Sequence, residues 1–159
     1  MNTFVIVIFI ALVAYFTWQG SVSKKKAKEN NTQGNIFLEK NKQIEGVLVT
    51  ASGLQVLQLQ PGTGAVHAKP LDKVKVHYHG TLIDGTVFDS SVDRGEPIEF
   101  SLNQVIPGWT EGLQLMVEGE KSRLFIPSNL GYGNRNSGQI PAGSTLIFDV
   151  ELIKITTDS

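Results

Sequence analysis

One short helix pattern stands among a series of strand patterns in the residues that follow Val47. Trp109, Leu113 and Met116 recur at i, i+4 and i+7 and form one apolar stripe, and Pro107 ends the strand-like pattern before them. Two or three helical turns are not stable alone in water, so this helix must pack against something larger. Strands without long helices between them cannot make parallel crossovers. The sheet is therefore predicted to be mainly antiparallel, with one covered face.

The strand patterns alternate apolar and polar residues and are bounded by turn residues. In the clearest of them, Val74, Val76 and Tyr78 point to one face, and the lysines and histidines between them point to the other. The pair Asp84-Gly85 indicates a hairpin turn. The combination of these strands with one short helix makes the predicted fold class α+β. Further strands are predicted near residues 47–49, 54–59, 86–88, 98–100, 122–126 and 145–155.

The first 18 residues are almost wholly apolar and carry no charged side chain. At about 1.5 Å per residue, such a helix just spans a hydrocarbon core of roughly 30 Å, and residues 1–20 are predicted to form a single transmembrane anchor. The alternatives are a cleaved signal peptide, which would begin with a basic residue, and a buried core helix, which would be amphipathic. Lysines follow the segment and none precedes it. The positive-inside rule then favours a domain that faces the cytoplasm, with the periplasmic face as the alternative.

Composition divides the remaining chain at Gly46. Residues 21–46 are polar, with six lysines against three glutamates, and contain too few apolar residues to offset the entropy of ordering, so they are predicted to be a basic linker. Residues 47–159 form the predicted domain, with eight basic and twelve acidic residues and a formal charge of −4. An acidic domain without a basic stripe is not expected to bind nucleic acid.

The domain lacks the residues of most catalytic sites. The chain has no cysteine, which excludes thiol catalysis and zinc–thiolate sites. His77 and His79 share a strand face, but two ligands are an incomplete metal site, and solvated histidines are the favoured interpretation. Motifs for a nucleophilic serine, a phosphate loop or a dinucleotide fold are absent. No metal and no cofactor is therefore predicted.

Aromatic residues are the remaining chemical feature, with seven in residues 47–159. Most such residues fill a core, but Tyr132 lies between two glycines in a loop, which favours a pocket. At these positions the sequence resembles the FKBP-type peptidyl-prolyl cis/trans isomerases, and it is most similar to bacterial members of the macrophage infectivity potentiator group. The resemblance covers roughly residues 53–155 and rests on five segments in order, at 76–80, 85–91, 105–109, 131–133 and 146–152.

The resemblance implies a twisted antiparallel β-sheet wrapped around one short α-helix, here preceded by the predicted transmembrane helix. It also implies a site, although Ile98 stands where many members have phenylalanine, which bears on sequence preference and on drug affinity. Arg94 would be the ion partner of Asp89. The implied catalytic residues are Tyr78, Asp89, Trp109, Tyr132 and Phe148, and the implied substrate-binding residues are Phe88, Ile98, Val105, Ile106 and Ile140.

The activity implied is the acceleration of X-Pro bond rotation during protein folding, through apolar enclosure of the twisted amide. Clients would be proline-containing polypeptides, with macrolides as further ligands. The alternatives are a non-catalytic chaperone and a module on the same fold that binds proline segments or macrolides. The anchor would hold the protein in the bacterial inner membrane, and the domain itself is expected to be monomeric.

Overall fold

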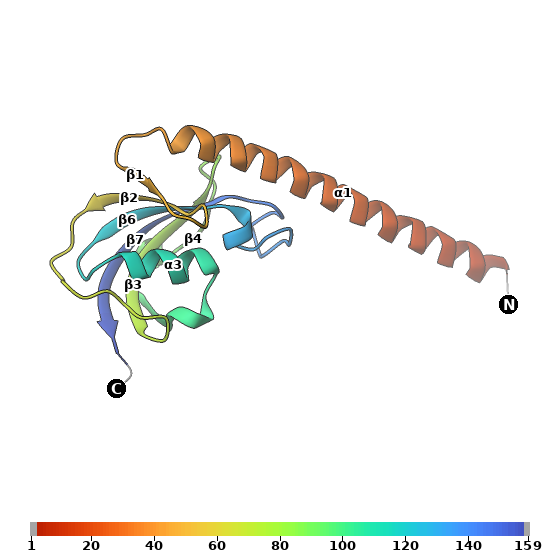
Figure 1. Ribbon diagram of the computed structural model, residues 1–159. Helices are drawn as coiled ribbons and strands as arrows, with labels where there is room; N and C mark the ends of the chain where they lie inside the picture. The colour runs from red at the N-terminus through yellow and green to blue at the C-terminus, as the bar shows by residue number, and fades with distance from the viewer. Residues whose placement is uncertain (1–2, 158–159) are drawn as a thin grey trace.

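A seven-stranded antiparallel β-sheet curves around a short helix, and a long helix extends from it (Figure 1). The computed structural model describes residues 3–157, and within the first helix it omits the side chains of residues 3–14, 16 and 18. The strand order is β1-β2-β6-β7-β3-β4, and β5 pairs with β3 beside this path. The elements are α1 (Thr3–Asn41), β1 (Val47–Val49), β2 (Gln55–Gln60), β3 (Lys73–Leu82), β4 (Val87–Ser90), α2 (Ser91–Arg94), β5 (Ile98–Ser101), the 3₁₀ helix η1 (Leu102–Gln104), α3 (Pro107–Leu115), β6 (Lys121–Ile126), the 3₁₀ helix η2 (Ser128–Leu130) and β7 (Leu146–Thr156).

The antiparallel sheet predicted from the sequence is confirmed, because each strand pairing is antiparallel. Its longest pairing is that of β3 with β7, in which Tyr78 lies opposite Val150 and Gly80 lies opposite Phe148. The alternation along β3 has the predicted effect, since Val74, Val76 and Tyr78 are buried. The sheet therefore has one covered face, which carries the core.

Helix α3 packs closely on that face because two glycines lie on its inner side. Gly108 and Gly112 are one turn apart, and a Cβ at these positions would lie 2.6 Å from Ile126 and 2.8 Å from Leu124 of β6. Pro107 occupies the first turn, where its missing N–H costs no helical hydrogen bond. The close approach places Trp109, which follows Gly108, on the interior of the sheet.

The predicted transmembrane anchor is contradicted. Within the part of the chain that the structure describes, no helix is long and apolar enough to cross a membrane. Helix α1 does not end with the apolar segment and runs without a break through the lysines to Asn41. Most side chains of residues 1–18, on which the prediction rested, lie outside the described residues. The prediction of a single-pass membrane protein with a domain facing the cytoplasm depended on this anchor, so that prediction is also wrong.

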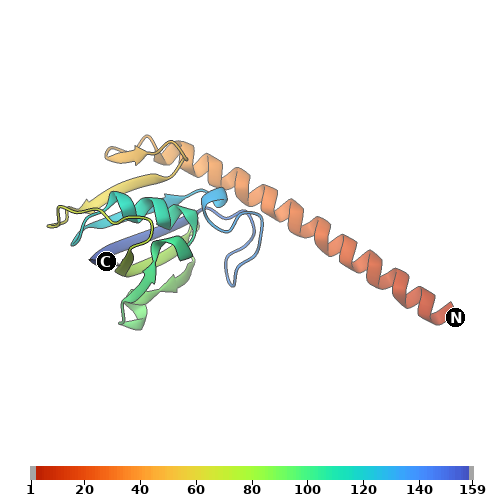
Figure 2. The ribbon, with the colours of Figure 1, turned by 60° about the horizontal axis from the view of Figure 1, so that its bottom comes forward.

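Residues 21–41, for which the sequence indicated a linker, belong to the same helix. Figure 2 shows that α1 extends well beyond the sheet, whereas its C-terminal part lies against it. On this part Ala27, Leu38 and Asn41 are buried, and the Phe37 ring lies 6.0 Å from that of Phe125 on β6. The buried positions recur at helical spacing, but they are mostly small or polar. Hydrophobic periodicity, the main signal for an amphipathic helix, therefore does not reveal them.

Candidate functional site

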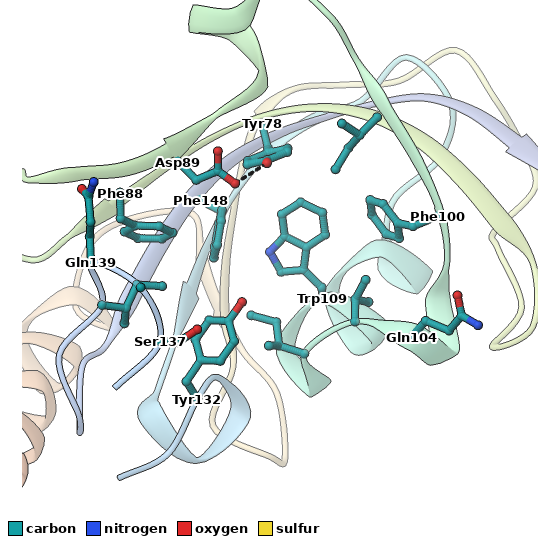
Figure 3. A pocket seen from close by; sticks show the side chains of 15 residues that line it. Tyr78, Phe88, Asp89, Phe100, Gln104, Trp109, Tyr132, Ser137, Gln139 and Phe148 are labelled. Atoms are coloured by element: carbon teal, nitrogen blue, oxygen red, sulfur yellow. Dashed lines mark hydrogen bonds between the residues drawn. The ribbon is translucent and has the colours of Figure 1, made fainter. Parts of the chain in front are cut away.

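A cavity of about 610 Å³ opens on the covered face of the sheet, between α3 and the long loop that joins β6 to β7 (Figure 3). This size is within the ordinary range of small-molecule and peptide pockets. Most of its wall is aromatic or aliphatic. The residues that line it are Tyr78, Phe88, Asp89, Ile98, Phe100, Gln104, Val105, Ile106, Trp109, Tyr132, Ser137, Gly138, Gln139, Ile140 and Phe148.

The floor of the cavity is a cluster of aromatic rings around Trp109, which is only 5% exposed. The Trp109 ring meets Tyr78 at 5.2 Å and Phe148 at 5.0 Å between centroids, with interplanar angles of 80° and 82°. Phe88 makes a similar edge-to-face contact with Phe148 at 5.3 Å. Such pairs contribute about 0.5–1.5 kcal/mol each beyond the area that they bury. Mutual contacts thus hold the rings in place and leave a rigid apolar surface.

Gly80 allows two of these rings to lie against the strand. A Cβ at Gly80 would lie 2.7 Å from the ring of Phe88 and 2.8 Å from that of Phe148. The space above this residue of β3 is therefore filled by aromatic rings from β4 and β7. The absence of a side chain on β3 is what lets the pocket wall form at this point.

Three polar side chains form a network at the edge of the pocket. The Tyr78 hydroxyl donates to Asp89 Oδ2 at 2.5 Å, and Arg94 Nη2 donates to the Tyr78 oxygen at 2.9 Å. Arg94 also forms an ion pair with Asp89, and its guanidinium lies 5.7 Å from the centre of the Tyr78 ring. The network joins β3, β4 and α2 and closes one side of the cavity.

The network keeps its members in defined protonation states. Burial opposes ionisation of Asp89, but the hydrogen bonds from Tyr78 and Arg94 and the charge of Arg94 outweigh it, so its pKa lies below the ordinary value. Burial, followed by the hydrogen bond to Asp89, raises the pKa of Tyr78. Hydrogen bonds to Tyr78 and Asp89 raise the pKa of Arg94. At neutral pH the group is therefore carboxylate, phenol and guanidinium.

The one-turn helix α2 explains how Arg94 reaches back to Asp89. Ser90 caps its N-terminus by accepting a hydrogen bond from the Asp93 N–H at 3.1 Å. Gly95 ends it in the left-handed conformation, at φ 73°, which a residue with a side chain adopts reluctantly. This short turn folds the chain back on itself, so the side chains at 89 and 94 meet.

The predicted site residues gather around this cavity. The ten implied catalytic and substrate-binding residues all line it, and Arg94 contacts two of them from outside. The implied site set did not include the remaining lining residues, Phe100, Gln104, Ser137, Gly138 and Gln139. Alternation from Ile98 along β5 could have indicated Phe100, but no local signal marks the polar residues of the loops.

The two histidines of β3 lie on the opposite face of the sheet from the pocket. His77 Nδ1 and Ser91 Oγ are 2.9 Å apart, and His79 Nδ1 and Ser90 Oγ are also 2.9 Å apart. Both histidines therefore contact the serines that begin α2. Among the described residues, no group of three or more His, Cys, Asp and Glu could hold a metal ion.

Comparison with known proteins relates this pocket to a family. The family described as FKBP-type peptidyl-prolyl cis-trans isomerase matches residues 64–153, and the domain amino terminal to FKBP-type peptidyl-prolyl isomerase matches residues 10–56. The chain is 58% identical over 131 residues to an FKBP-type peptidyl-prolyl cis-trans isomerase FkpA of Aeromonas hydrophila, a match that covers 82% of this chain and 48% of that protein. It is 50% identical over 132 residues to the outer membrane protein MIP of Legionella longbeachae, which covers 82% of this chain and 56% of that protein.

The fold is shared as well. The crystal structure of FkpA from Escherichia coli superimposes with a TM-score of 0.88 at 38% sequence identity, covering 98% of this chain and 74% of that one. The chain spans about half the length of the two curated relatives named above. The likeness to bacterial members predicted from the sequence is confirmed. From its motifs, its fold and its aromatic pocket, the chain belongs to the FKBP-type peptidyl-prolyl cis-trans isomerase family.

Proposed function

We propose that this chain is a peptidyl-prolyl cis/trans isomerase that accelerates X-Pro rotation in protein chains. The observation that carries the proposal is the rigid aromatic floor around Trp109, joined at its edge to the network of Tyr78, Asp89 and Arg94. Family membership supports the same activity. The cavity of about 610 Å³ has room for a proline ring and the residues beside it.

The barrier to X-Pro rotation explains why such a pocket is enough. Rotation costs about 18–20 kcal/mol because amide resonance is lost in the twisted state. The planar amide has a polarised carbonyl that water stabilises, whereas the twisted amide has less charge on that oxygen. An apolar enclosure therefore disfavours the planar form more than the twisted form, and the barrier falls. No nucleophile and no proton transfer is needed.

Each wall residue has a place in this mechanism. Trp109 would support the proline ring from below, and the edges of Tyr78 and Phe148 would enclose it. Phe88, Ile98, Val105 and Ile140 complete the apolar wall around the residues that flank the proline.

Polar groups at the rim would hold the substrate chain in register. We assign the Ile106 backbone N–H and the Tyr132 hydroxyl to substrate carbonyl groups, which fix the chain on either side of the rotating bond. Tyr132 is 40% exposed and its hydroxyl is directed toward the cavity (Figure 3). Asp89 would orient Tyr78 and shape the local field, and Arg94 would keep Asp89 ionised.

The catalytic unit is proposed to be residues 47–159, which contain all the lining residues. Proline-containing polypeptides are the proposed clients, and the apolar pocket also suits macrolides. Asp89 is the one ionised side chain among the residues that line the pocket, and it already forms an ion pair with Arg94. The pocket therefore has little reason to select a charged residue before the proline.

The test is isomerisation of a short X-Pro peptide by the full chain. The uncatalysed reaction takes tens to hundreds of seconds. After a sudden change in the cis/trans ratio of the peptide, the peptide returns to equilibrium. The rate of this return should increase in proportion to the protein concentration. Asp84→Asn, a change at an exposed hairpin turn that does not line the cavity, serves as a control and should behave like the original protein. A folded protein that binds the peptide but leaves the rate unchanged would be a binding module instead.

A further inference from the structure

The loop between β6 and β7, residues 127–145, supplies one side of the pocket. It carries Tyr132 and Ile140 and has little regular structure apart from η2. Backbone hydrogen bonds within the loop give it its local shape, among them those from the Gly133 N–H to Ser128 O and from the Gly143 N–H to Gly133 O, both at 2.8 Å. Loops of this length and composition are ordinarily the least stable part of a domain. Contacts with other elements then decide where the loop, with Tyr132 and Ile140, lies relative to the rest of the domain.

One turn of α1 makes hydrogen bonds to three points of this loop. Asn30 Nδ2 donates to Ala142 O at 2.8 Å, near the end of the loop. Asn31 Nδ2 donates to Asn134 Oδ1 at 2.8 Å, in its middle, and Asn31 Oδ1 accepts from the Ser128 hydroxyl at its start. The bonded residues are about 100 positions apart in the chain. Asn31 thus ties two separate parts of the loop to one rigid element.

Helix α1 also makes close contacts with the loop that involve backbone atoms. A Cβ at Gly143 would collide with the Ala27 carbonyl oxygen of α1, and a Cβ at Gly34 would collide with the Thr145 hydroxyl. Gly143 has φ 77°, so both its conformation and its contact require glycine. Both contacts are close, and the one between Gly143 and Ala27 is made by backbone alone, which leaves little freedom for the loop to shift relative to α1.

We infer that α1 positions the pocket loop, and that Asn31 is a positioning residue for the isomerase reaction. The inference rests on the proposed function for its catalytic consequence. Asn31 lies outside the cavity and touches no substrate. It acts through Ser128 and Asn134, which flank Tyr132 on the loop. A loop ordered in advance need not be ordered by the substrate, so the effect should be on binding more than on turnover.

The experiment compares Asn31→Ala with Asn41→Ala in the full chain. Asn41 is a matched control because it also joins α1 to the domain, through a hydrogen bond from its Nδ2 to Gln55 Oε1 at 2.8 Å, but it contacts β2 and not the loop. We expect Asn31→Ala to raise KM severalfold with a smaller change in kcat, and Asn41→Ala to leave both near the original values. Amide hydrogen exchange at Gly133 and Gly143 should become faster in Asn31→Ala alone.

A conservative variant separates positioning from general loss of structure. Asn31→Asp keeps an acceptor for the Ser128 hydroxyl, and the Asn134 amide can turn to donate to its second oxygen. We expect this variant to restore most of the KM. Equal KM values in Asn31→Ala and Asn41→Ala, or unchanged exchange at Gly133 and Gly143, would overturn the inference. If the original protein proved inactive, the proposed function would fail. The exchange measurement would still decide whether Asn31 orders the loop.

Discussion

The Tyr78 hydroxyl and the Asp89 carboxylate are joined by a hydrogen bond of 2.5 Å at the edge of the aromatic cavity. The Tyr78 ring is part of the aromatic floor of the cavity, and the Tyr78 oxygen is part of the polar network at its edge. Arg94 contacts both groups, so the Tyr78 hydroxyl is also linked to the ion pair of Asp89 and Arg94 at the edge of the cavity. The apolar and polar parts of the site are therefore coupled through one side chain.

Replacing Asp89 by alanine should lower kcat/KM severalfold or more. The change removes the acceptor for Tyr78 and leaves Arg94 without its carboxylate, so the Tyr78 hydroxyl loses its fixed orientation while the buried rings remain packed. The melting temperature should change only slightly, because the Asp89 side chain is itself exposed to solvent. Peptide isomerisation and thermal unfolding of the same sample provide the measurement. A rate equal to that of the original protein would leave apolar enclosure alone as the mechanism.

Tyr132→Phe should cause a smaller loss than Asp89→Ala. The substitution deletes one hydroxyl at the pocket edge, and a single hydrogen bond contributes about 1 kcal/mol, or roughly fivefold in rate. The ring itself stays and the loop should keep its shape. The comparison is made on kcat/KM for one peptide. An effect larger than that of Asp89→Ala would mean that the Tyr132 hydroxyl has more than the substrate-holding role assigned to it.

The contribution of Asp89 to stability should depend on pH in one direction. Its pKa is lower in the folded protein than in the unfolded chain, so the unfolded chain binds more protons in the interval between the two values. The stabilisation is present above the unfolded pKa of about 3.9 and is lost as the pH falls through the folded value. The difference in melting temperature between the original protein and Asp89→Asn should therefore be present at neutral pH and shrink in acid. A difference that grows toward low pH would contradict the assigned direction.

Gly108→Ala should destabilise the protein although alanine is the better helix former. The added Cβ would lie 2.6 Å from Ile126, a fully buried and β-branched residue with little freedom to move. Overpacking of this kind costs about 1–3 kcal/mol, against a gain of up to about 1 kcal/mol in helix propensity. Gly20→Ala is the control, because no atom lies within 4 Å of a Cβ at that position of α1. Denaturant unfolding should show a loss for the first variant and no loss for the second.

Some of the fold could be predicted because it depends on neighbours in the chain. Alternation along β3 places Val74, Val76 and Tyr78 on one face whatever partner strand they have. The apolar stripe of Trp109, Leu113 and Met116 likewise predicts a helix that needs a sheet to cover it, and all three side chains are buried. The aromatic lining followed from resemblance of whole motifs, since the pattern alone could not separate pocket from core.

Helix α1 shows where this reasoning failed. By composition alone, its apolar first part indicates a transmembrane anchor and its polar second part indicates a linker. The structure has one continuous helix whose inner side carries Ala27, Gly34, Leu38 and Asn41. Small and polar residues bury little apolar area, so no local pattern marks them as an interface.

The sequence by itself determined which residues form strands, where the short helix lies and which aromatic residues are available for a pocket. These features depend on dihedral preference and on a period of two or 3.6, and both act within a few residues. The tertiary structure alone decided that Asn31 reaches Ser128 and Asn134. It also decided that the space above Gly80 is filled by Phe88 and Phe148 from two other strands. Such contacts join residues from separate elements, and their geometry is set by how closely whole elements pack, which no local pattern records.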